Sequence, residues 1–280
     1  MTSPARRKLL KNARKKRMRR SVRVYSLYGV AGVLLLLLVV LGLAYGAHRP
    51  EVTITSVRVK GAEVADTRDI ASRAEAMLQG SYFFIFPKAN FFLYPKSAIV
   101  RDILASDTRL ESANISRSGA EVVVAIIEHR PTYLWCDTTG GKPMDENAGL
   151  DEKCFFANSE GYVFAEAPSF SGHVYVVLRG PLYGEGADPR GKRYLPTPQF
   201  TKISELISLL SAKNIVSRSV RAMGSGDYAL SVKEGTEVRF SIAQEASRLA
   251  ENLQSAAAVL ADKKQPEYID LRFGNKVFYK

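Results

Sequence analysis

The apolar positions of the sequence form one long unbroken run, followed by a region of short periodic segments. The run, Val24–Ala47, is 24 residues long and carries no charged side chain. A helix of that length would extend about 36 Å, which is enough to cross a hydrocarbon core of about 30 Å. The pattern therefore predicts one transmembrane helix at 24–47.

A cleaved secretory signal is the alternative interpretation of this run. Signal sequences have an apolar core of about 7–15 residues, followed by a cleavage site with small residues. Ala44-Tyr45-Gly46 resembles such a site, but the apolar run is longer than a signal core. We therefore expect an uncleaved membrane anchor.

The periodicity of residues 50–131 predicts the order strand, helix, helix, strand, strand. β-branched residues favour a strand at 52–61, where a break in the apolar alternation indicates a bulge. Asp66 is suited to cap a helix with apolar residues at helical spacing, and Gly80 is suited to end it. The remaining predicted elements are a helix from Pro95 and two strands, 112–117 and 121–128, joined by a hairpin turn at Ser118-Gly119.

An aromatic run at 82–95 lies between the two predicted helices. It consists of Tyr82-Phe83-Phe84-Ile85-Phe86-Pro87 and then Phe91-Phe92-Leu93-Tyr94-Pro95. Two interpretations are open. These side chains fill the core under the sheet, or they form a surface that rests on the membrane interface.

Residues 132–280 have the pattern of a mixed β domain with flanking helices. Loops are expected between Trp135 and Cys154 and, as a mobile segment, at 180–196. One helix is predicted to begin at Thr197 and another at a capping box, Ser241-Ile242-Ala243-Gln244. The predicted strands are 155–158, 162–164, 173–178, 228–232, 237–240, 268–273 and 276–280, with turns at Glu234-Gly235 and Gly274-Asn275.

These patterns together predict an α+β chain in four parts. The parts are a basic tail at 1–23, the transmembrane helix at 24–47, a β-α-α-β-β domain at 50–131 and the mixed β domain with flanking helices at 132–280.

Charge is distributed unevenly along this plan. The chain has 40 Lys and Arg residues against 28 Asp and Glu, and eleven of the cations precede residue 29 with no acidic residue among them. Such clusters beside a first membrane helix usually remain cytoplasmic, so the long C-terminal region is predicted to be extracytoplasmic. Anionic lipids are the expected contact of the tail. Nucleic acid is the alternative, but we expect none, because the membrane helix follows directly.

The sequence lacks a recognisable catalytic or metal-binding constellation. His48, His129 and His173 are scattered, and no HExxH, GxSxG or Ser-x-x-Lys motif is present. Gly140-Gly141-Lys142 lacks the spacing of a phosphate-binding loop. We expect no enzymatic activity, no cofactor and no metal.

Cys136 and Cys154 are the two cysteines of the chain. The predicted topology places both outside the cytoplasm, where disulfides persist. Closing a loop of this length would stabilise the fold by about 3 kcal/mol in the chain-entropy model. A disulfide is the expected state, and two buried free thiols are the alternative.

Four local motifs in this order resemble the FtsQ/DivIB family of bacterial cell-division proteins. The motifs are Val57–Gly61 at the end of the first strand, the hydrophobic-Glu-x-Arg-Pro signature Ile127–Pro131, the strand pair Phe155–Phe164 with Glu160-Gly161 at its turn, and Tyr268–Arg272 near the end of the chain. The aromatic run and the cysteine pair are not general features of the family.

This resemblance implies a fold and a function. Residues 50–131 would be a POTRA domain, with Gly61, Glu128, Arg130 and Pro131 as its signature, and 132–280 would be an FtsQ-type β domain. The protein would be a divisome scaffold at the septum of the plasma membrane. It would recruit and regulate septal peptidoglycan synthesis by binding FtsB/FtsL-like bitopic coiled-coil proteins and other divisome members.

The physical mechanism that fits this role is strand addition, in which a partner segment pairs with an exposed sheet edge. The candidate edge is the last strand, and the aromatics there have core filling as their alternative role. Phe278 is predicted on one face of it, with Val277 and Tyr279 on the other. The candidate partner-binding residues are Tyr268, Asp270, Arg272, Phe273, Lys276, Val277, Phe278 and Tyr279.

A POTRA-containing transport or envelope-assembly component, anchored in the membrane, is the alternative function. Such a component normally continues into a barrel with at least eight strands of alternating pattern. Residues 154–280 have two predicted helices and fewer alternating strands than that. The sequence therefore favours the scaffold.

Overall fold

The computed structural model describes residues 4–137, 153–170, 172–232, 235–260, 266–274 and 276–280, with side chains from residue 25 onward except at 258–260. The chain forms two compact units. One comprises residues 1–60, 66–103 and 114–125, and the other comprises 61–65, 104–113 and 126–280. Most of the loop expected between Trp135 and Cys154 (residues 138–152) and the turn residues Glu234 and Asn275 lie outside the described residues.

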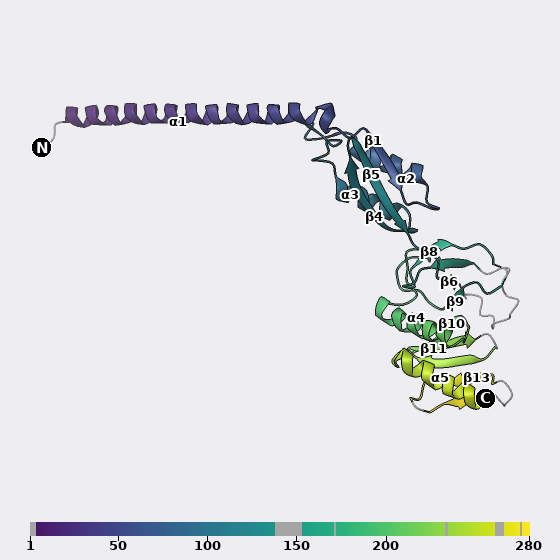
Figure 1. Cartoon of the computed structure of the whole chain (residues 1–280). Coiled ribbons are helices and arrows are strands. Elements are labelled where there is room, and N and C mark those ends of the chain that lie inside the picture. Colours follow the sequence, from purple (N-terminus) through teal and green to yellow (C-terminus); the bar gives the residue numbers. More distant parts are fainter. Residues whose placement is uncertain (1–3, 138–152, 171, 233–234, 261–265, 275) are drawn as a thin grey trace. The chain divides into compact units, whose positions relative to one another are not determined.

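The chain begins with a long helix, α1, Pro4–Ala47 (Figure 1). Its segment Tyr25–Ala47 is apolar and long enough to cross a membrane, and no other helix among the described residues is. The predicted apolar helix is therefore present. It begins earlier than expected, because the basic tail has no Gly or Pro between Pro4 and Gly29 to interrupt a run rich in good helix formers. Pro50 prevents its continuation, since proline lacks the backbone N–H that a helix needs.

The elements after α1 follow the order expected for residues 50–131, except that a short hairpin of two strands, which was not predicted, lies between the two helices. They build a small three-stranded sheet in the order β1-β5-β4, with β1 parallel to β5, and the buried side chains Ile70, Ala74 and Leu78 recur every four residues along one helix. The elements are β1 (Ser56–Lys60), α2 (Thr67–Leu78), β2 (Ser81–Tyr82), β3 (Phe86–Pro87), α3 (Lys96–Ser106), β4 (Leu110–Ser118) and β5 (Glu121–Glu128).

The bulge expected in the first strand is absent. β1 pairs with β5 without a register shift from Ser56 to Lys60. The residues before Ser56 belong to other structure, since Pro50–Val52 is a short 3-10 helix and Ile54 donates its backbone N–H to Ala89 O at 2.8 Å. The break in alternation therefore marks where the strand begins.

The rest of the chain forms one large mixed sheet of nine strands. Its order is β14-β13-β12-β11-β10-β9-β6-β7-β8. β9 is parallel to both of its neighbours, β10 and β6, and β12 is parallel to β13. The elements are β6 (Tyr133–Cys136), β7 (Cys154–Ala157), β8 (Val163–Glu166), β9 (Val176–Arg179), α4 (Thr197–Ala212), β10 (Ser217–Gly224), β11 (Asp227–Val232), β12 (Glu237–Ser241), α5 (Ala246–Leu260), β13 (Tyr268–Asp270) and β14 (Phe278–Tyr279).

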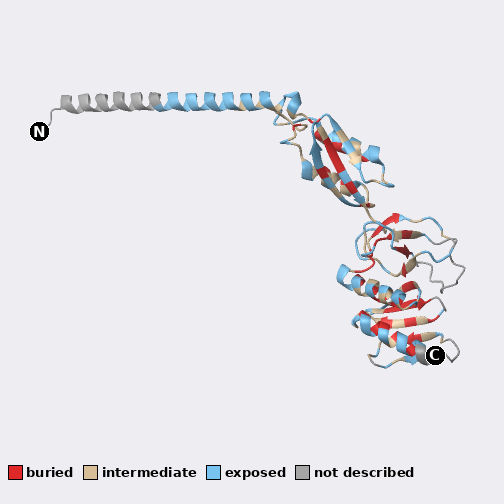
Figure 2. Ribbon diagram, in the orientation of Figure 1, coloured by how far each residue is buried: buried red, intermediate tan, exposed pale blue. Residues whose placement is uncertain are grey.

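Helices α4 and α5 supply the apolar cover of this large sheet. Phe200, Ile203 and Leu210 of α4 are fully buried and belong to one cluster with alternate strand residues such as Leu230 and Phe240. Because successive strand residues point to opposite faces, the residues between these, including Arg239, lie on the other face. Figure 2 shows the buried residues concentrated along the strands and on the sheet side of the helices.

Three features of the large sheet differ from the expectations. Strands β6 and β10 were not predicted, although β6, β9 and β10 join its two halves. The prediction that a capping box at Ser241 begins the helix is wrong, because Ser241 ends β12 and the helix begins at Ala246. The segment 180–196, expected to be mobile, pairs Tyr183 with Arg193 through two backbone hydrogen bonds of 2.7 and 3.1 Å.

Candidate functional site

The two ends of the large sheet, β8 and β14, are covered to different extents. At β8, Val163 donates its N–H to Lys192 O and accepts from Gly191 N–H, both at 2.8 Å. Thr108 Oγ1 donates to Phe164 O at 2.7 Å. These contacts occupy the outer side of β8, so the loop 180–196 and Thr108 protect this end from strand addition.

Strand β14 forms the opposite end, and no described strand lies beyond it. It is antiparallel to β13, with Asp270 opposite Phe278 and Ile269 opposite Tyr279. Lys280 donates its N–H to Tyr268 O at 3.2 Å and accepts from Glu267 N–H at 2.6 Å. Backbone groups of alternate residues point to opposite sides of a strand, so every second residue of this segment faces away from β13.

The side chains of this terminal strand divide between the two faces as predicted. Val277 packs against the cluster beneath α4 and α5, and Tyr279 lies beside Ile269 on the same face. Phe278 lies beside Asp270 on the opposite face. Core filling therefore accounts for Val277, but it does not account for Phe278, which is half exposed.

A charged network holds the segment that connects β13 to β14. Arg272 donates to Asp270 through Nε–Oδ1 (3.0 Å) and Nη2–Oδ2 (2.7 Å), and through Nη1 to Asp227 Oδ2 (3.0 Å). Asp270 is buried, and the hydrogen bonds from Arg272 hold its pKa below its usual range. Since Asp227 belongs to β11, the guanidinium ties β13, the strand next to the edge, to a strand two positions further inward.

Exposed aromatic rings lie beside this network. Phe273 and Phe278 meet edge to face with ring centroids 5.4 Å apart, and they are 58% and 50% exposed. The Arg239 guanidinium lies 4.2 Å from the ring centroid of Tyr268. A strand end flanked by exposed aromatics offers both backbone hydrogen bonds and apolar anchors, which are the two parts of strand-addition recognition.

The residues expected at this site are therefore close together in the structure. All eight lie on β13, on β14 or in the segment that connects them. Sequence reasoning missed Asp227 and Arg239. The signal available for Arg239 was its charge two positions from Glu237, which predicts a polar face on an otherwise apolar strand.

Gly61 directly follows β1 and Glu128 ends β5, and a tight turn after Gly61 reaches Glu128. Gly61 has φ +84°, and a Cβ there would lie 2.3 Å from Ile126 O. The turn that follows directs three backbone N–H groups, at residues 63, 64 and 65, to Glu128 Oε1 at 2.7, 3.0 and 3.0 Å. Arg130 and Pro131, the other two signature residues, are exposed.

The carboxylate of Glu128 is stabilised in its charged form. Burial raises its pKa, but the three N–H donors and the positive charge of Arg109 lower it, and the net pKa lies below the usual value. Glu128 therefore acts as a fixed anion that closes the turn after β1. This contact gives a structural reason for the pairing of glycine and glutamate in the sequence.

The described residues contain no group of three or more His, Cys, Asp or Glu that could hold a metal ion. One of these side chains, His129, packs against aromatic rings. Its ring lies against Tyr162 at 4.8 Å and Phe164 at 5.4 Å, and burial lowers its pKa.

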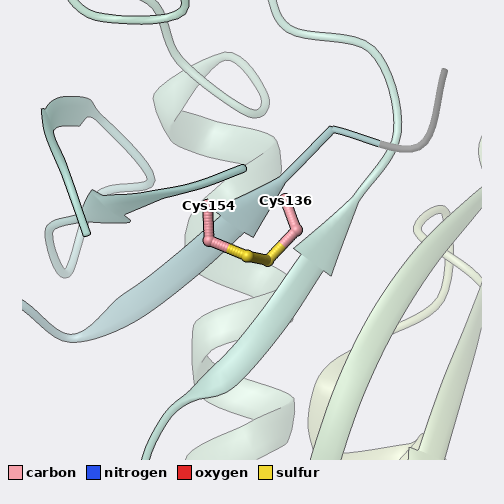
Figure 3. Close-up of a disulfide and its surroundings, with 2 residues drawn as sticks. All are labelled: Cys136 and Cys154. Carbon is pink, nitrogen blue, oxygen red and sulfur yellow. A yellow bond between two sulfur atoms is a disulfide. The ribbon is translucent and has the colours of Figure 1, made fainter. Parts of the chain in front are cut away.

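Cys136 and Cys154 form a disulfide, the state favoured over two free thiols. The bond joins the paired ends of the antiparallel strands β6 and β7 (Figure 3). It lies beside Trp135, whose Nε1 donates to Gly180 O at 2.9 Å. The disulfide closes the segment between the two strands and fixes their register at that end.

Comparison with known proteins gives no family assignment for this chain. No protein-family model matches the chain, and no curated protein matches it.

Proposed function

We propose that this protein is a non-enzymatic divisome scaffold of the FtsQ/DivIB type, which binds small bitopic coiled-coil division proteins by strand addition at β14. The observation that carries the proposal is the asymmetry of the large sheet. β8 is covered through its own backbone, whereas β14 ends the sheet beside exposed aromatic rings. Proteins usually protect sheet edges, and the last strand of a sheet can serve as a template for another chain.

The second support for this proposal is the rigid structure next to β14, in which the charged side chains are hydrogen-bonded to one another. Strand addition needs an edge that keeps its register while unoccupied, because disorder would add an entropic cost to binding. The bidentate pair of Arg272 with Asp270, and its third bond to Asp227, hold β13 and the following turn against β11. The ion pairs of Arg272 therefore hold the edge of the sheet in place before a partner binds.

The membrane part of the proposal has the chain crossing the plasma membrane once through Tyr25–Ala47, with the N-terminus in the cytoplasm. Its support is the single described helix long enough to cross and the cluster of cations that precedes it. Residues 50–131 act as a POTRA domain in this proposal. The strand and helix order and the hydrogen bonds between Glu128 and the turn after Gly61 are consistent with that assignment.

Localisation and depletion in the bacterium that encodes the chain test this function. A fluorescent protein fused to the N-terminus should form a ring at mid-cell, and depletion of the chain should block division and produce filaments. The control is a fusion to residues 1–49 alone, which has the membrane helix but neither sheet and should label the whole membrane. A uniform signal from the full chain during constriction, with normal division after depletion, would contradict the proposal.

A further inference from the structure

The aromatic run between α2 and α3 is exposed, so the core-filling interpretation is wrong for its most apolar members. Phe83 is 87% exposed, Phe84 is fully exposed and Phe92 is 79% exposed. Ile85 and Leu93 are also exposed, whereas Asn90 is the one buried residue of 82–95. An exposed cluster of large apolar side chains marks an interaction surface.

The backbone presents two of these rings at a conformational cost. Strands β2 and β3 form a hairpin with Tyr82 opposite Phe86, and Ile85 donates its N–H to Tyr82 O at 3.0 Å. The central residues Phe83 and Phe84 have φ of 51° and 61°. Turns with positive φ at both central residues favour Asn and Gly, because side chains with a Cβ are strained there. A turn of two phenylalanines is therefore unfavourable in water on both counts, strain and exposure.

Hydrogen bonds hold this segment close to the end of α1. Asn90 Nδ2 donates to Ala47 O at 3.1 Å, and Phe91 N–H donates to Val52 O at 3.1 Å. Ala47 is the last residue of the apolar helix. Thr53, which bridges to Asn90, follows Ala47 by six residues, and six residues extend at most about 21 Å. Asn90, inside the aromatic segment, therefore lies near the end of the membrane helix.

The charges around the segment suit a lipid surface. Residues 76–101 contain no Asp or Glu, but they include Lys88, Lys96 and Arg101. Arg117 lies with its guanidinium 3.6 Å from the ring centroid of Phe91, and Lys88 Nζ lies 5.9 Å from that of Tyr82. Cations beside aromatic rings are the pattern of interfacial anchors, where the rings enter the boundary of the acyl chains and the cations meet anionic head groups.

We propose that the hairpin turn and the following segment, residues 83–93, insert Phe83, Phe84 and Phe92 into the head-group boundary of the membrane that α1 crosses. This inference rests on the membrane crossing proposed above and not on the partner edge. The lipid interface is the occupant that the short tether, the exposed rings and the local absence of carboxylates together favour. The insertion adds a second contact with the bilayer directly after the helix.

Tryptophan fluorescence of the full chain in proteoliposomes tests this insertion. The liposomes contain anionic lipid and phosphatidylcholine brominated on the acyl chain, near its upper part in one preparation and near its end in another, which quenches tryptophans at each depth. The native Trp135 is buried in β6 and provides the reference emission. The probes are F84W and F92W, the latter at a residue without positive φ.

Two matched variants set the limits of the signal. L37W places a tryptophan inside the apolar helix, and I127W places one at an exposed residue (58%) near the far end of β5, about 20 Å along the strand from Glu121. Both F84W and F92W should be quenched at least about twofold more strongly than I127W, because interfacial rings enter the boundary by about 5–10 Å.

The outcomes separate this inference from the proposed function. Quenching of L37W with F84W and F92W no more quenched than I127W would overturn the insertion and leave the membrane crossing intact. Probes that are shielded from aqueous acrylamide but not quenched by brominated lipid would overturn it in favour of a covering protein, such as a second copy. An unquenched L37W would overturn both the crossing and the insertion.

Discussion

The substitution Gly61→Ala should lower the free energy of unfolding by about 4 kcal/mol. Gly61 has a left-handed backbone, which costs an L-residue about 1–2 kcal/mol. The new Cβ would also lie 2.3 Å from Ile126 O, a backbone atom that cannot move aside without breaking the pairing of β5. Equilibrium denaturant unfolding of the full chain in detergent, followed by the fluorescence of Trp135, measures the change.

Gly80→Ala is the matched control for this substitution. Gly80 has nearly the same backbone, with φ +81° against +84°, but no atom within 4 Å of the added Cβ. Its cost should therefore be the conformational term alone, about 1–2 kcal/mol. Equal costs for the two variants would mean that the close approach of Ile126 does not matter, and the structural account of the turn after β1 would be wrong.

The substitution Arg272→Ala should cost about 3 kcal/mol and should loosen the terminal strands before the rest of the large sheet unfolds. It removes the donor of three bonds and leaves the carboxylate of Asp270, which is 95% buried, without its counter-charge. Hydrogen exchange of the backbone amides, combined with denaturant unfolding, should show early exchange in β13 and β14.

The pair formed by Arg190 with Asp188 provides a control with the same Asp-x-Arg spacing. Its geometry is also bidentate, but both side chains are about half exposed. Exposed ion pairs contribute about 0–1 kcal/mol, so Arg190→Ala should be nearly neutral. A cost for Arg190→Ala equal to that of Arg272→Ala would show that burial is not the source of the effect.

The ion pair formed by Arg272 with Asp270 stabilises the fold in a pH-dependent way. Arg272 lowers the pKa of Asp270 in the folded protein, so the unfolded state binds more protons in the acid range. The stabilisation is therefore complete above the usual carboxyl pKa and is lost as the pH falls through the depressed pKa. The difference in stability between the wild type and Arg272→Ala should shrink over that acid window and stay constant at neutral pH.

Features of the fold that depend on local pattern could be predicted from the sequence. An unbroken apolar run predicts a long apolar helix regardless of its surroundings, and α1 contains it. Turn residues and helical periodicity likewise predicted the order of the elements at 50–131, apart from the short hairpin β2-β3. The final hairpin was predicted because its two apolar strands flank a glycine turn.

Features that depend on pairing between distant segments could not be predicted. β10 contains Ser217, Arg218, Ser219 and Arg221, and only its neighbours β9 and β11 make such a polar segment a central strand. The contact of Arg272 with Asp227 joins residues 45 positions apart, which no spacing rule identifies. The capping box at Ser241 failed for a related reason, because its residues were taken by the end of β12 and the turn after it.

The exposure of the aromatic run could not be predicted from the sequence either. A pattern rich in phenylalanine normally predicts a core, since burial of each ring is favourable. The structure instead holds these rings outward on a hairpin fixed by Asn90 at the end of α1. Only the three-dimensional position of that hairpin shows whether its phenylalanine side chains are buried in a core or exposed.

The central claim, that β14 is the edge on which a partner chain pairs, is tested most directly by measuring the affinity of the full chain for the proposed FtsB/FtsL-like partner in detergent or nanodiscs. The variant is Phe278→Lys, at a ring that is half exposed beside the edge, and the control is Val216→Lys, at an equally exposed residue outside the last two strands. Both variants should unfold at the same denaturant concentration as the wild type.

The account predicts that Phe278→Lys weakens binding at least about thirtyfold, the loss of about 2 kcal/mol that marks an anchoring residue, while Val216→Lys stays within about twofold. A lysine on the edge both removes the aromatic anchor and opposes strand pairing. Equal affinity of wild type and Phe278→Lys for the partner would contradict the account.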